Sequence, residues 1–346
     1  MRLTPLMLLA ALAADAVPAL AQDAPQHIVV VHQSVGAART AAYQGRDRGP
    51  EQTDRFSRKL KLGRDGRVSI GNISGDIVVT GGAGDELSID AVKRTRGDQS
   101  QLANVRITVD DRAGRVDVRT EYDMSRSTRN NSVSVDYTVT VPAGASVELK
   151  SVSGSIKVTG VRGAVRAESV SGDVTTTDTP KVELAKSVSG DVTLSGIQIE
   201  GDLSASSVSG AVRAKGVKAH SLDLSSVSGD LTVSDVTCDR LNAKSVSGAF
   251  EYSGNISRGG VYDVNLHSGT ARFVLANPTG FELTANTFSG NIRSDLPLTI
   301  GGDQDRARDN RTHRGPGNRA IRATFGDGSA TLTVHTFSGD IVIAKR

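Results

Sequence analysis

A seven-residue stretch, SVSGDVT, occurs at residues 169–175 and again at 187–193, and close variants recur between residues 151 and 251. The glycines of this S-x-S-G motif follow one another along the chain at spacings of 18, 18, 20, 19 and 19, and the variants HSG and TFSG continue the series at spacings of 21 and 21. The marker glycines are Gly154, Gly172, Gly190, Gly210, Gly229, Gly248, Gly269 and Gly290, and the motif returns at Gly339. A period of roughly 19 positions is too short for a pair of helices and is typical of single coils that stack into a solenoid.

The residues between these glycines indicate strands rather than helices, because Val, Ser, Thr and Gly dominate and apolar residues recur at a period of two. Inward residues of one strand are all even-numbered or all odd-numbered, because side chains alternate between the two faces. In the first full coil the apolar positions change from even to odd after Val158 and back to even after Ala167, and each change requires a corner. The inward set predicted in this way is Val152, Ile156, Val158, Val161, Val165, Ala167 and Val170. The sequence therefore predicts an all-β fold, a single-chain β-solenoid resembling a parallel β-helix, with two main strands per coil and corners at 158–161 and 167–170. A further bend at the motif glycine would make the cross-section triangular.

The two serines of the motif are expected to face outward on either side of the motif valine. One predicted row is Ser153, Ser171, Ser189, Ser209, Ser228 and Ser247, and the row beside it is Ser151, Ser169, Ser187, Ser207, Ser226 and Ser245. The glycine that follows permits a tight corner that a Cβ atom would obstruct.

The start of the chain, MRLTPLMLLAALAADAVPALAQDA, has the three parts of a secretory signal peptide. These are a basic Arg2, an apolar run from Leu6 to Ala14 and the small-x-small sequence Ala19-Leu20-Ala21. No other apolar run reaches the roughly 20 residues of a membrane-spanning helix. We therefore expect a signal peptide over residues 1–21, cleavage before Gln22, and a periplasmic or secreted protein without a transmembrane segment.

Composition divides the rest of the chain into five segments. We expect a flexible N-terminal segment over 22–61, a first coil with a strand-rich N-terminal cap over 62–150, regular coils over 151–300, an Arg/Gly-rich loop over 301–320, and a closing coil over 321–346. The cap is expected to cover the exposed edge of the array. Phe288 and Phe337 replace the motif valine near the far end, where we expect them to close the core.

The repeated serines are not expected to be catalytic. A serine nucleophile needs a base and an oxyanion site around one residue, whereas these serines have the same small neighbours, and no histidine recurs with them. His267 is the unusual histidine, because it stands where other coils carry Val. We predict no catalytic residue and interpret the serines as corner residues.

Aspartates follow several motif glycines and are candidates for calcium ligands. They are Asp76, Asp173, Asp191, Asp230 and Asp340. Calcium takes 6 to 8 oxygen ligands, so neighbouring coils would have to supply them together, but alanines interrupt the row at Ala211 and Ala249. We expect these aspartates to stabilise turns, and we expect no metal or cofactor.

Net charge and aromatic content argue against two kinds of binding site and leave one candidate binding element. A formal net charge of +3 lacks the excess that binding to nucleic acid requires, and 3% aromatic residues without Trp argue against an open sugar-binding cleft. The candidate binding element is the Arg-rich loop, in which acidic residues offset part of the charge. Its arginines are Arg306, Arg308, Arg311, Arg314 and Arg319. The guanidinium group of arginine binds phosphate and carboxylate groups through two parallel hydrogen bonds, so an envelope protein or a surface glycan is the expected partner. A solvated loop without a partner is the simpler interpretation.

The sequence also resembles a known family, the bacterial putative-adhesin family (domain of unknown function 4097). The resemblance is carried by the repeated S-x-S-G-D-[VI]-x-[VL], by VTVPAGASVELKSVSG at residues 139–154 and by ATLTVHTFSGDIVI at residues 330–343, and it covers most of residues 62–346. It implies a β-solenoid of the cell envelope and transfers no catalytic residue. The hypothesis is a non-enzymatic envelope scaffold or adhesin-like binding protein. The alternatives are a carbohydrate-active β-helix enzyme similar to polysaccharide lyases and, as a minor one, an ice-binding type of solenoid.

Overall fold

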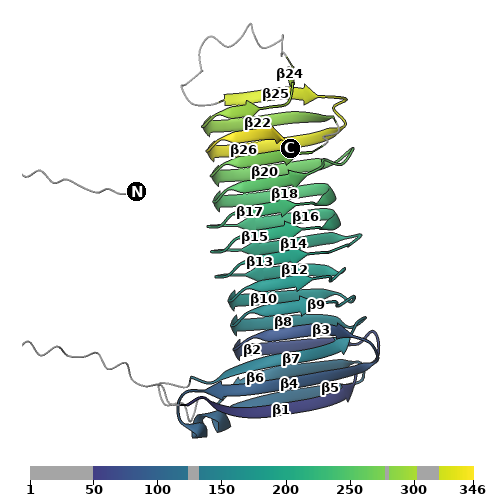
Figure 1. Ribbon diagram of the computed structural model, residues 1–346, viewed down its shortest axis with the longest axis vertical. Coiled ribbons are helices and arrows are strands. Elements are labelled where there is room, and N and C mark those ends of the chain that lie inside the picture. Colours follow the sequence, from purple (N-terminus) through teal and green to yellow (C-terminus); the bar gives the residue numbers. More distant parts are fainter. Residues whose placement is uncertain (1–49, 124–131, 277–279, 302–318) are drawn as a thin grey trace, which may run out of the picture. The chain divides into compact units, whose positions relative to one another are not determined.

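Each sequence repeat forms one coil with a strand in each of two long sheets (Figure 1). The computed structural model describes residues 50–123, 132–276, 280–301 and 319–346, all within a unit that spans Arg48–Arg346. Equivalent strands of successive coils pair in parallel, for example β10 with β8 and β12, and β11 with β9 and β13. These observations confirm an all-β solenoid with two strands per coil. The expected signal peptide and cleavage site lie outside the described residues.

The strand that ends in the motif belongs to a 14-stranded sheet, which we call the motif sheet, and the strand after the motif glycine belongs to a 13-stranded second sheet. The regular strands of the motif sheet are β8 (Ser146–Ser153), β10 (Val165–Ser171), β12 (Val182–Ser187), β14 (Asp202–Ser207), β16 (Lys218–Ser226), β18 (Thr237–Ser247) and β20 (Val261–Ser268). Those of the second sheet are β9 (Ile156–Thr159), β11 (Val174–Thr177), β13 (Val192–Ser195), β15 (Val212–Lys215), β17 (Leu231–Ser234), β19 (Phe250–Gly254) and β21 (Ala271–Leu275).

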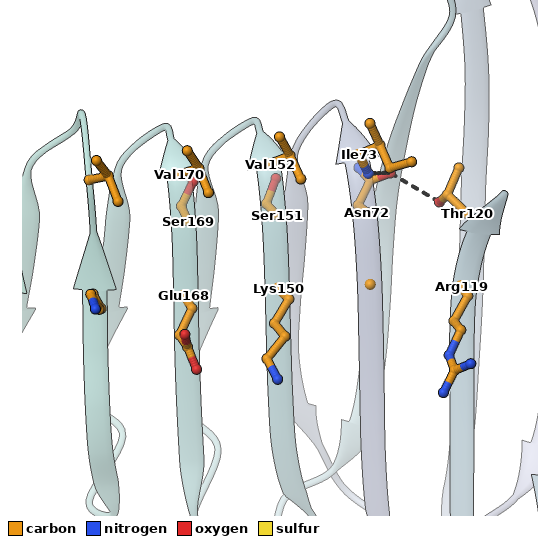
Figure 2. Close-up of a pocket in the computed structure, with 13 residues that line it drawn as sticks. Asn72, Ile73, Arg119, Thr120, Lys150, Ser151, Val152, Glu168, Ser169 and Val170 are labelled. Carbon is orange, nitrogen blue, oxygen red and sulfur yellow. Dashed lines mark hydrogen bonds between the residues drawn. The ribbon is translucent and has the colours of Figure 1, made fainter. Parts of the chain in front are cut away.

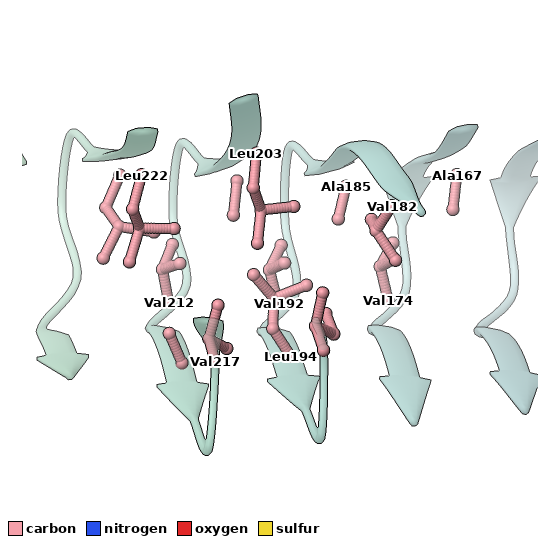
Figure 3. Packing of buried hydrophobic residues seen from close by; sticks show 14 of the residues in the cluster. Ala167, Val174, Val182, Ala185, Val192, Leu194, Leu203, Val212, Val217 and Leu222 are labelled. Carbon is pink, nitrogen blue, oxygen red and sulfur yellow. The ribbon is translucent and has the colours of Figure 1, made fainter. Parts of the chain in front are cut away.

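The core is a narrow seam between the two sheets, filled by ladders of stacked apolar side chains (Figure 3). In the second sheet, Val174 aligns with Ile156 on one side and Val192 on the other, and all three are fully buried. Facing them from the motif sheet are smaller residues such as Ala167 and Ala185. Because parallel strands lie about 4.8 Å apart, each inward side chain packs on its equivalents in the coils before and after it, so the core is continuous along the stack.

Thr176 interrupts one of these apolar ladders. It aligns with Val158 and Leu194, it is completely buried, and its hydroxyl has no hydrogen-bond partner among the described residues. A buried polar group without a partner costs about 1–3 kcal/mol.

We therefore expect Thr176→Val, which keeps the shape of the side chain and removes the hydroxyl, to raise the free energy of unfolding by about 1–2 kcal/mol. The measurement is urea unfolding followed by circular dichroism. Thr175→Val is the matched control, because Thr175 lies next to it on the outward side of β11 and is half-buried. A midpoint for Thr176→Val at or below that of the parent chain would contradict the proposal that the hydroxyl is unsatisfied.

At the N-terminal end, the order of strands in space differs from their order in the chain. The first coil, β2 (Arg67–Ser74) and β3 (Ile77–Gly82), stacks directly on β8 and β9, and the later strands β6 (Arg115–Tyr122) and β7 (Ser134–Pro142) form the next coil outward. Antiparallel strands cover that coil, namely β4 (Glu86–Thr95), β1 (Gln52–Lys61) and β5 (Val105–Arg112), together with the short 3-10 helix η1 (Gln99–Asn104). The flexible segment expected over 22–61 is therefore corrected at its end, because Gln52–Lys61 pair with β4 along their full length.

The C-terminal end is rearranged in a similar way. The last coil of the chain, β26 (Ala330–Ser338) and β27 (Ile341–Lys345), lies between the coil of β20 and β21 and the coil of β22 (Phe281–Ser289) and β23 (Ile292–Ser294). β25 (Arg319–Phe325) then pairs antiparallel with β22, and β24 (Thr299–Ile300) pairs with β25. The coil expected to close the array is thus second from its end, and β22 to β25 cover it.

The structure corrects the expected orientation of the motif. Val152 and Val170 are 50% and 46% exposed rather than inward, and the serines before them, Ser151 and Ser169, are buried rather than outward. The corner expected at 167–170 lies at the motif glycine instead, because β10 continues to Ser171 and β11 begins at Val174. Phe288 and Phe337, expected to close the core, are also exposed, at 49% and 50%.

Candidate binding ridge

The motif glycines are placed where neighbouring coils touch. A Cβ atom added at Gly190 would lie 2.3 Å from the carbonyl oxygen of Gly172 and 2.5 Å from its carbonyl carbon. The same contact with the glycine of the adjacent coil occurs along the whole array. At Gly190 the need for glycine is therefore one of space between backbones, and it fixes the stacking of the coils at the corner.

Most buried serines of the motif bond to these glycines; Ser151 is the exception, because its hydroxyl has no partner among the described residues. Ser187 donates its hydroxyl to the carbonyl oxygen of Gly172 at 2.8 Å, and Ser207 does the same to Gly190 at 2.8 Å. Equivalent bonds come from Ser169, Ser226, Ser245, Thr287 and Thr336. A hydroxyl with a partner can be buried at little cost, whereas one without a partner cannot. These bonds offset the cost of burying the hydroxyls and join neighbouring coils at the corner.

The aspartates after the glycines form a second ladder on the other side of the corner. Asp173 accepts a hydrogen bond from the backbone N–H of Asp191, and Asp191 accepts one from Ala211, both at 2.9 Å. Asp76, Asp230 and Asp340 accept equivalent bonds from Ser155, Ala249 and Asn291. A hydrogen bond from Arg213 is the largest influence that lowers the pKa of Asp191. These carboxylates join coils, and within the described residues no three His, Cys, Asp or Glu side chains are grouped so that they could hold a metal.

The outward residues between the two motif serines form a continuous line that crosses the C-terminal ends of the strands of the motif sheet. We call this line the ridge. Following the order of the strands in space, it consists of Ile73, Val152, Val170, Val188, Val208, Val227, Val246, His267, Phe337 and Phe288. The exposed fraction is 39–50% for its large apolar members except the half-buried Val188. Scattered exposed apolar residues are common on proteins, but a contiguous apolar line marks an interaction surface.

Three stacked rings form the C-terminal end of the ridge. The ring centroids of Phe288 and Phe337 are 4.9 Å apart with 3° between the ring planes, and those of His267 and Phe337 are 5.1 Å apart with 5° between the planes. Phe337 is thus covered on both faces by the neighbouring rings, and this end of the ridge presents stacked, about half-exposed aromatic side chains.

A groove of about 480 Å³ follows the ridge over the coils nearest the N-terminal end (Figure 2). One wall is the ridge itself, from Ile73 to Val188, and the other wall is the next outward row of the motif sheet. This opposite wall contains Arg119, Lys150, Glu168 and Lys186. Gly71 has no side chain, which leaves room between the walls at its position. The groove joins an apolar wall to a mostly cationic one.

Beneath the groove, Asn72 takes the place of the buried serine in the first coil. Its amide nitrogen donates to the carbonyl oxygens of Gly75 and Val135 at 2.8 Å each, and its oxygen accepts a bond from Thr120. Thr120 in turn bonds to Tyr137 at 2.7 Å. Asn72 and Thr120 are therefore held by a connected polar network, whereas the buried hydroxyl of Ser151, which also lines the groove, has no partner among the described residues.

The ridge separates two rows of opposite charge. On the side of the motif sheet, two residues before the ridge position, the exposed cations are Lys150, Lys186 and Lys244, with Glu168 as the one acid of this row among the described coils. Arg119 on β6, aligned with Gly71, extends this row one strand beyond the ridge. On the side of the second sheet lie the aspartates that follow the motif glycines, Asp76, Asp173, Asp191, Asp230 and Asp340, and the described coils have no cation at that position. Lys150 also bonds to Glu148 at 2.8 Å, and this bond lowers the pKa of Glu148.

The candidate binding residues named from the sequence are placed only in part. Arg306, Arg308, Arg311 and Arg314 lie outside the described residues. Arg319 begins β25 and donates to the carbonyl oxygen of Gly290 at 2.8 Å and to Asn291. The ridge itself was missed, although His267 in place of Val was the available signal, because an inward core position does not readily take a histidine.

Comparison with known proteins gives one family and several distant structures. A family model described as Toastrack DUF4097 matches residues 66–344. A putative adhesin from Bacteroides fragilis is 13% identical, with 84% of this chain and 97% of that chain covered and a TM-score of 0.42. A putative lipid binding protein from Parabacteroides distasonis is 16% identical, with 65% and 91% covered and a TM-score of 0.40. No curated protein matches the chain.

The described residues contain no helix of the length and apolar character needed to cross a membrane.

Proposed function

The chain belongs to the Toastrack DUF4097 family, and on that premise we propose that it is a non-enzymatic scaffold of the cell envelope that binds through its apolar ridge. The observation that supports this proposal is the ridge itself, a line of about half-exposed Val, Ile and Phe side chains held at a fixed spacing by the stacked coils. Every coil is joined to the next by backbone pairing, and most coils are joined also by a bond of the serine ladder or of the aspartate ladder. Such a surface is presented without further ordering, which favours binding because little conformational entropy is lost.

The sequence of the first 21 residues supports the envelope as the proposed place of action. The basic start, apolar run and Ala19-Leu20-Ala21 site are the signature of a secreted chain, and we propose cleavage before Gln22 and a periplasmic or secreted location. An envelope protein or a surface glycan is then the accessible kind of partner. The cations beside the groove would favour a partner that carries carboxylate or phosphate groups near an apolar segment.

The chemistry of the groove supports binding rather than catalysis. Hydrolysis of a glycosidic bond commonly uses two carboxyl groups on either side of the bond, and Glu168 is the only carboxylate among the residues that line the groove. Asn72 and Thr120 on its floor are hydrogen-bonded to each other, and Ser151 is the one floor residue whose buried hydroxyl has no partner among the described residues. The exposed rows of the motif are Val and Ser, whereas ice-binding solenoids use rows of Thr. A polysaccharide lyase-like enzyme and an ice-binding solenoid remain the alternatives to the proposed scaffold.

Charged substitutions on the ridge test the proposal. We expect Val170→Glu combined with Val227→Glu to reduce the material captured from envelope extracts by at least about tenfold, because a charge must be desolvated when the ridge is covered. The mature chain is immobilised, and the captured proteins and glycans are quantified by mass spectrometry. The control is Thr175→Glu combined with Thr232→Glu, which adds the same charges to the same coils on the outward side of the second sheet. Equal capture by the ridge variant and the control would exclude the ridge as the binding face.

A further inference from the structure

We propose that the ridge binds a second copy of this chain, ridge to ridge and with both chains running in the same direction, so that a two-fold axis lies parallel to the stack. The inference rests on the proposed function, because it names the partner of the same ridge. In this dimer each ridge residue, from Ile73 to Phe288, faces the same residue of the other copy.

The ridge is long enough and apolar enough to form a stable dimer. Its ten positions at the spacing of parallel strands extend over about 43 Å. A buried Val contributes roughly 1.5–3 kcal/mol at about 25 cal/mol per Å², which corresponds to roughly 60–120 Å² of side-chain surface. With 39–50% of most ridge residues exposed, and with two larger Phe rings, complete ridge-to-ridge contact would bury on the order of 700–1,300 Å² over both copies, and the upper part of this range reaches the size of a specific interface.

The two charged rows select the direction of pairing. A two-fold axis parallel to the ridge exchanges its two sides, so the lysine side of one copy faces the aspartate side of the other. Lys186 then meets Asp191 at the same coil, Lys150 and Lys244 lie one coil from Asp173 and Asp230, and Glu168 is the one acid that meets an aspartate. A two-fold axis perpendicular to the ridge keeps the sides and reverses the order of coils, so cation would face cation. Charges within the roughly 8 Å screening length at physiological salt act on one another, so the second arrangement is disfavoured.

The ridge is also free to be covered along its whole described length. The groove beside it is open to solvent, and the exposed serines that follow each ridge residue, such as Ser171 and Ser228, offer hydroxyl groups at the rim. A closed, symmetric pair uses the same patch on both molecules, so each ridge position meets its own equivalent. Apolar contact in the centre with polar groups at the rim is the usual composition of an interface.

Sedimentation velocity of the full mature chain tests whether the pair forms. We expect a dimer at micromolar concentration, and we expect Val170→Glu combined with Val227→Glu to raise the dissociation constant at least about a hundredfold, since four charges are then placed in one interface. The control, Thr175→Glu combined with Thr232→Glu, should sediment as the parent chain does. Circular dichroism spectra and urea midpoints close to the parent value establish that both variants are folded.

A monomeric parent chain across this concentration range overturns the inference, and so does a dimer that the ridge variant leaves intact. The capture experiment separates this result from failure of the proposed function. A monomer whose capture of envelope material depends on the ridge has a different partner, so the scaffold proposal stands and the second copy is excluded.

Single cysteines determine the direction of the pair. Cys238 is 1% exposed, and burial raises the pKa of its thiol to about 12, so it does not compete in disulfide formation near neutral pH. We expect Val152→Cys and Val246→Cys each to form disulfide-linked dimers under mild oxidation, because equivalent positions face each other at every coil. In the reversed pair, the two copies of each position would be separated by several coils, far beyond the roughly 7 Å between Cα atoms that a disulfide permits. A crosslink formed only by the central variant Val208→Cys would overturn the proposed direction.

Discussion

Replacing Gly190 by Ala is expected to lower the free energy of unfolding by about 3 kcal/mol or more. The added Cβ atom would lie 2.3 Å from the carbonyl oxygen of Gly172, 2.5 Å from its carbonyl carbon and 3.0 Å from the nitrogen of Asp173. All three are backbone atoms of the coil below, which is itself held by the coil beneath it, so neither coil can move away without breaking strand pairing. Adding atoms to a tightly packed interior lowers the free energy of unfolding by about 1–3 kcal/mol and occasionally more. A clash with backbone atoms lies at the upper end of this range, because backbone atoms cannot rotate away as a side chain can.

The measurement is the urea midpoint of Gly190→Ala beside that of Gly201→Ala. Gly201 lies before β14, and a Cβ atom there would meet only the side chain of Ile199, at 3.9 Å. Gly201→Ala should therefore unfold at nearly the same urea concentration as the parent chain. If the two variants lose the same small amount of stability, the glycine of the motif is not required by the stacking of coils.

Replacing Phe273 by Ala is expected to cost about 3–5 kcal/mol, the range for removing a buried aromatic side chain. Phe273 is fully buried in β21, with its ring centroid 5.4 Å from that of Phe250 and 5.9 Å from that of Tyr252. These rings fill the core where it passes from small aliphatic residues to aromatic ones. The cavity left by the substitution cannot collapse, because strand pairing on both sides fixes the spacing of the sheets.

Phe337→Ala is the informative comparison, because it removes the same side chain from the ridge. Phe337 is 50% exposed, so its loss should lower the free energy of unfolding far less than the loss of Phe273. The ridge variant should instead weaken self-association. Equal destabilisation by the two substitutions would show that the C-terminal rings close the core and do not belong to a binding surface.

The sequence by itself determined the class of fold. The short, regular period of the motif, the two-residue alternation and the change of parity within each coil predict a two-sheet solenoid, and all of these are properties of short segments. Ile156, Val158, Val161, Val165 and Ala167 are buried as that alternation requires. Local pattern is sufficient here because each coil packs on a neighbour with the same pattern, so one correct coil predicts the next.

The tertiary structure decided which residues of the motif face the solvent. A change of parity after Ala167 was expected to place Val170 in the core and Ser169 outside, but β10 keeps its alternation to the motif, so the valine turns outward and the hydroxyl of Ser169 meets the carbonyl oxygen of Gly154 at 3.0 Å. That bond joins adjacent coils and exists only once they are stacked, so no single repeat reveals it. The ridge, and with it the candidate site, follows from this inter-coil contact. The order of the end coils was decided in the same way: β6 and β7 lie outside β2 and β3, and β26 and β27 lie inside β22 and β23, because pairing between strands is set by contact across sheet edges and not by position along the chain.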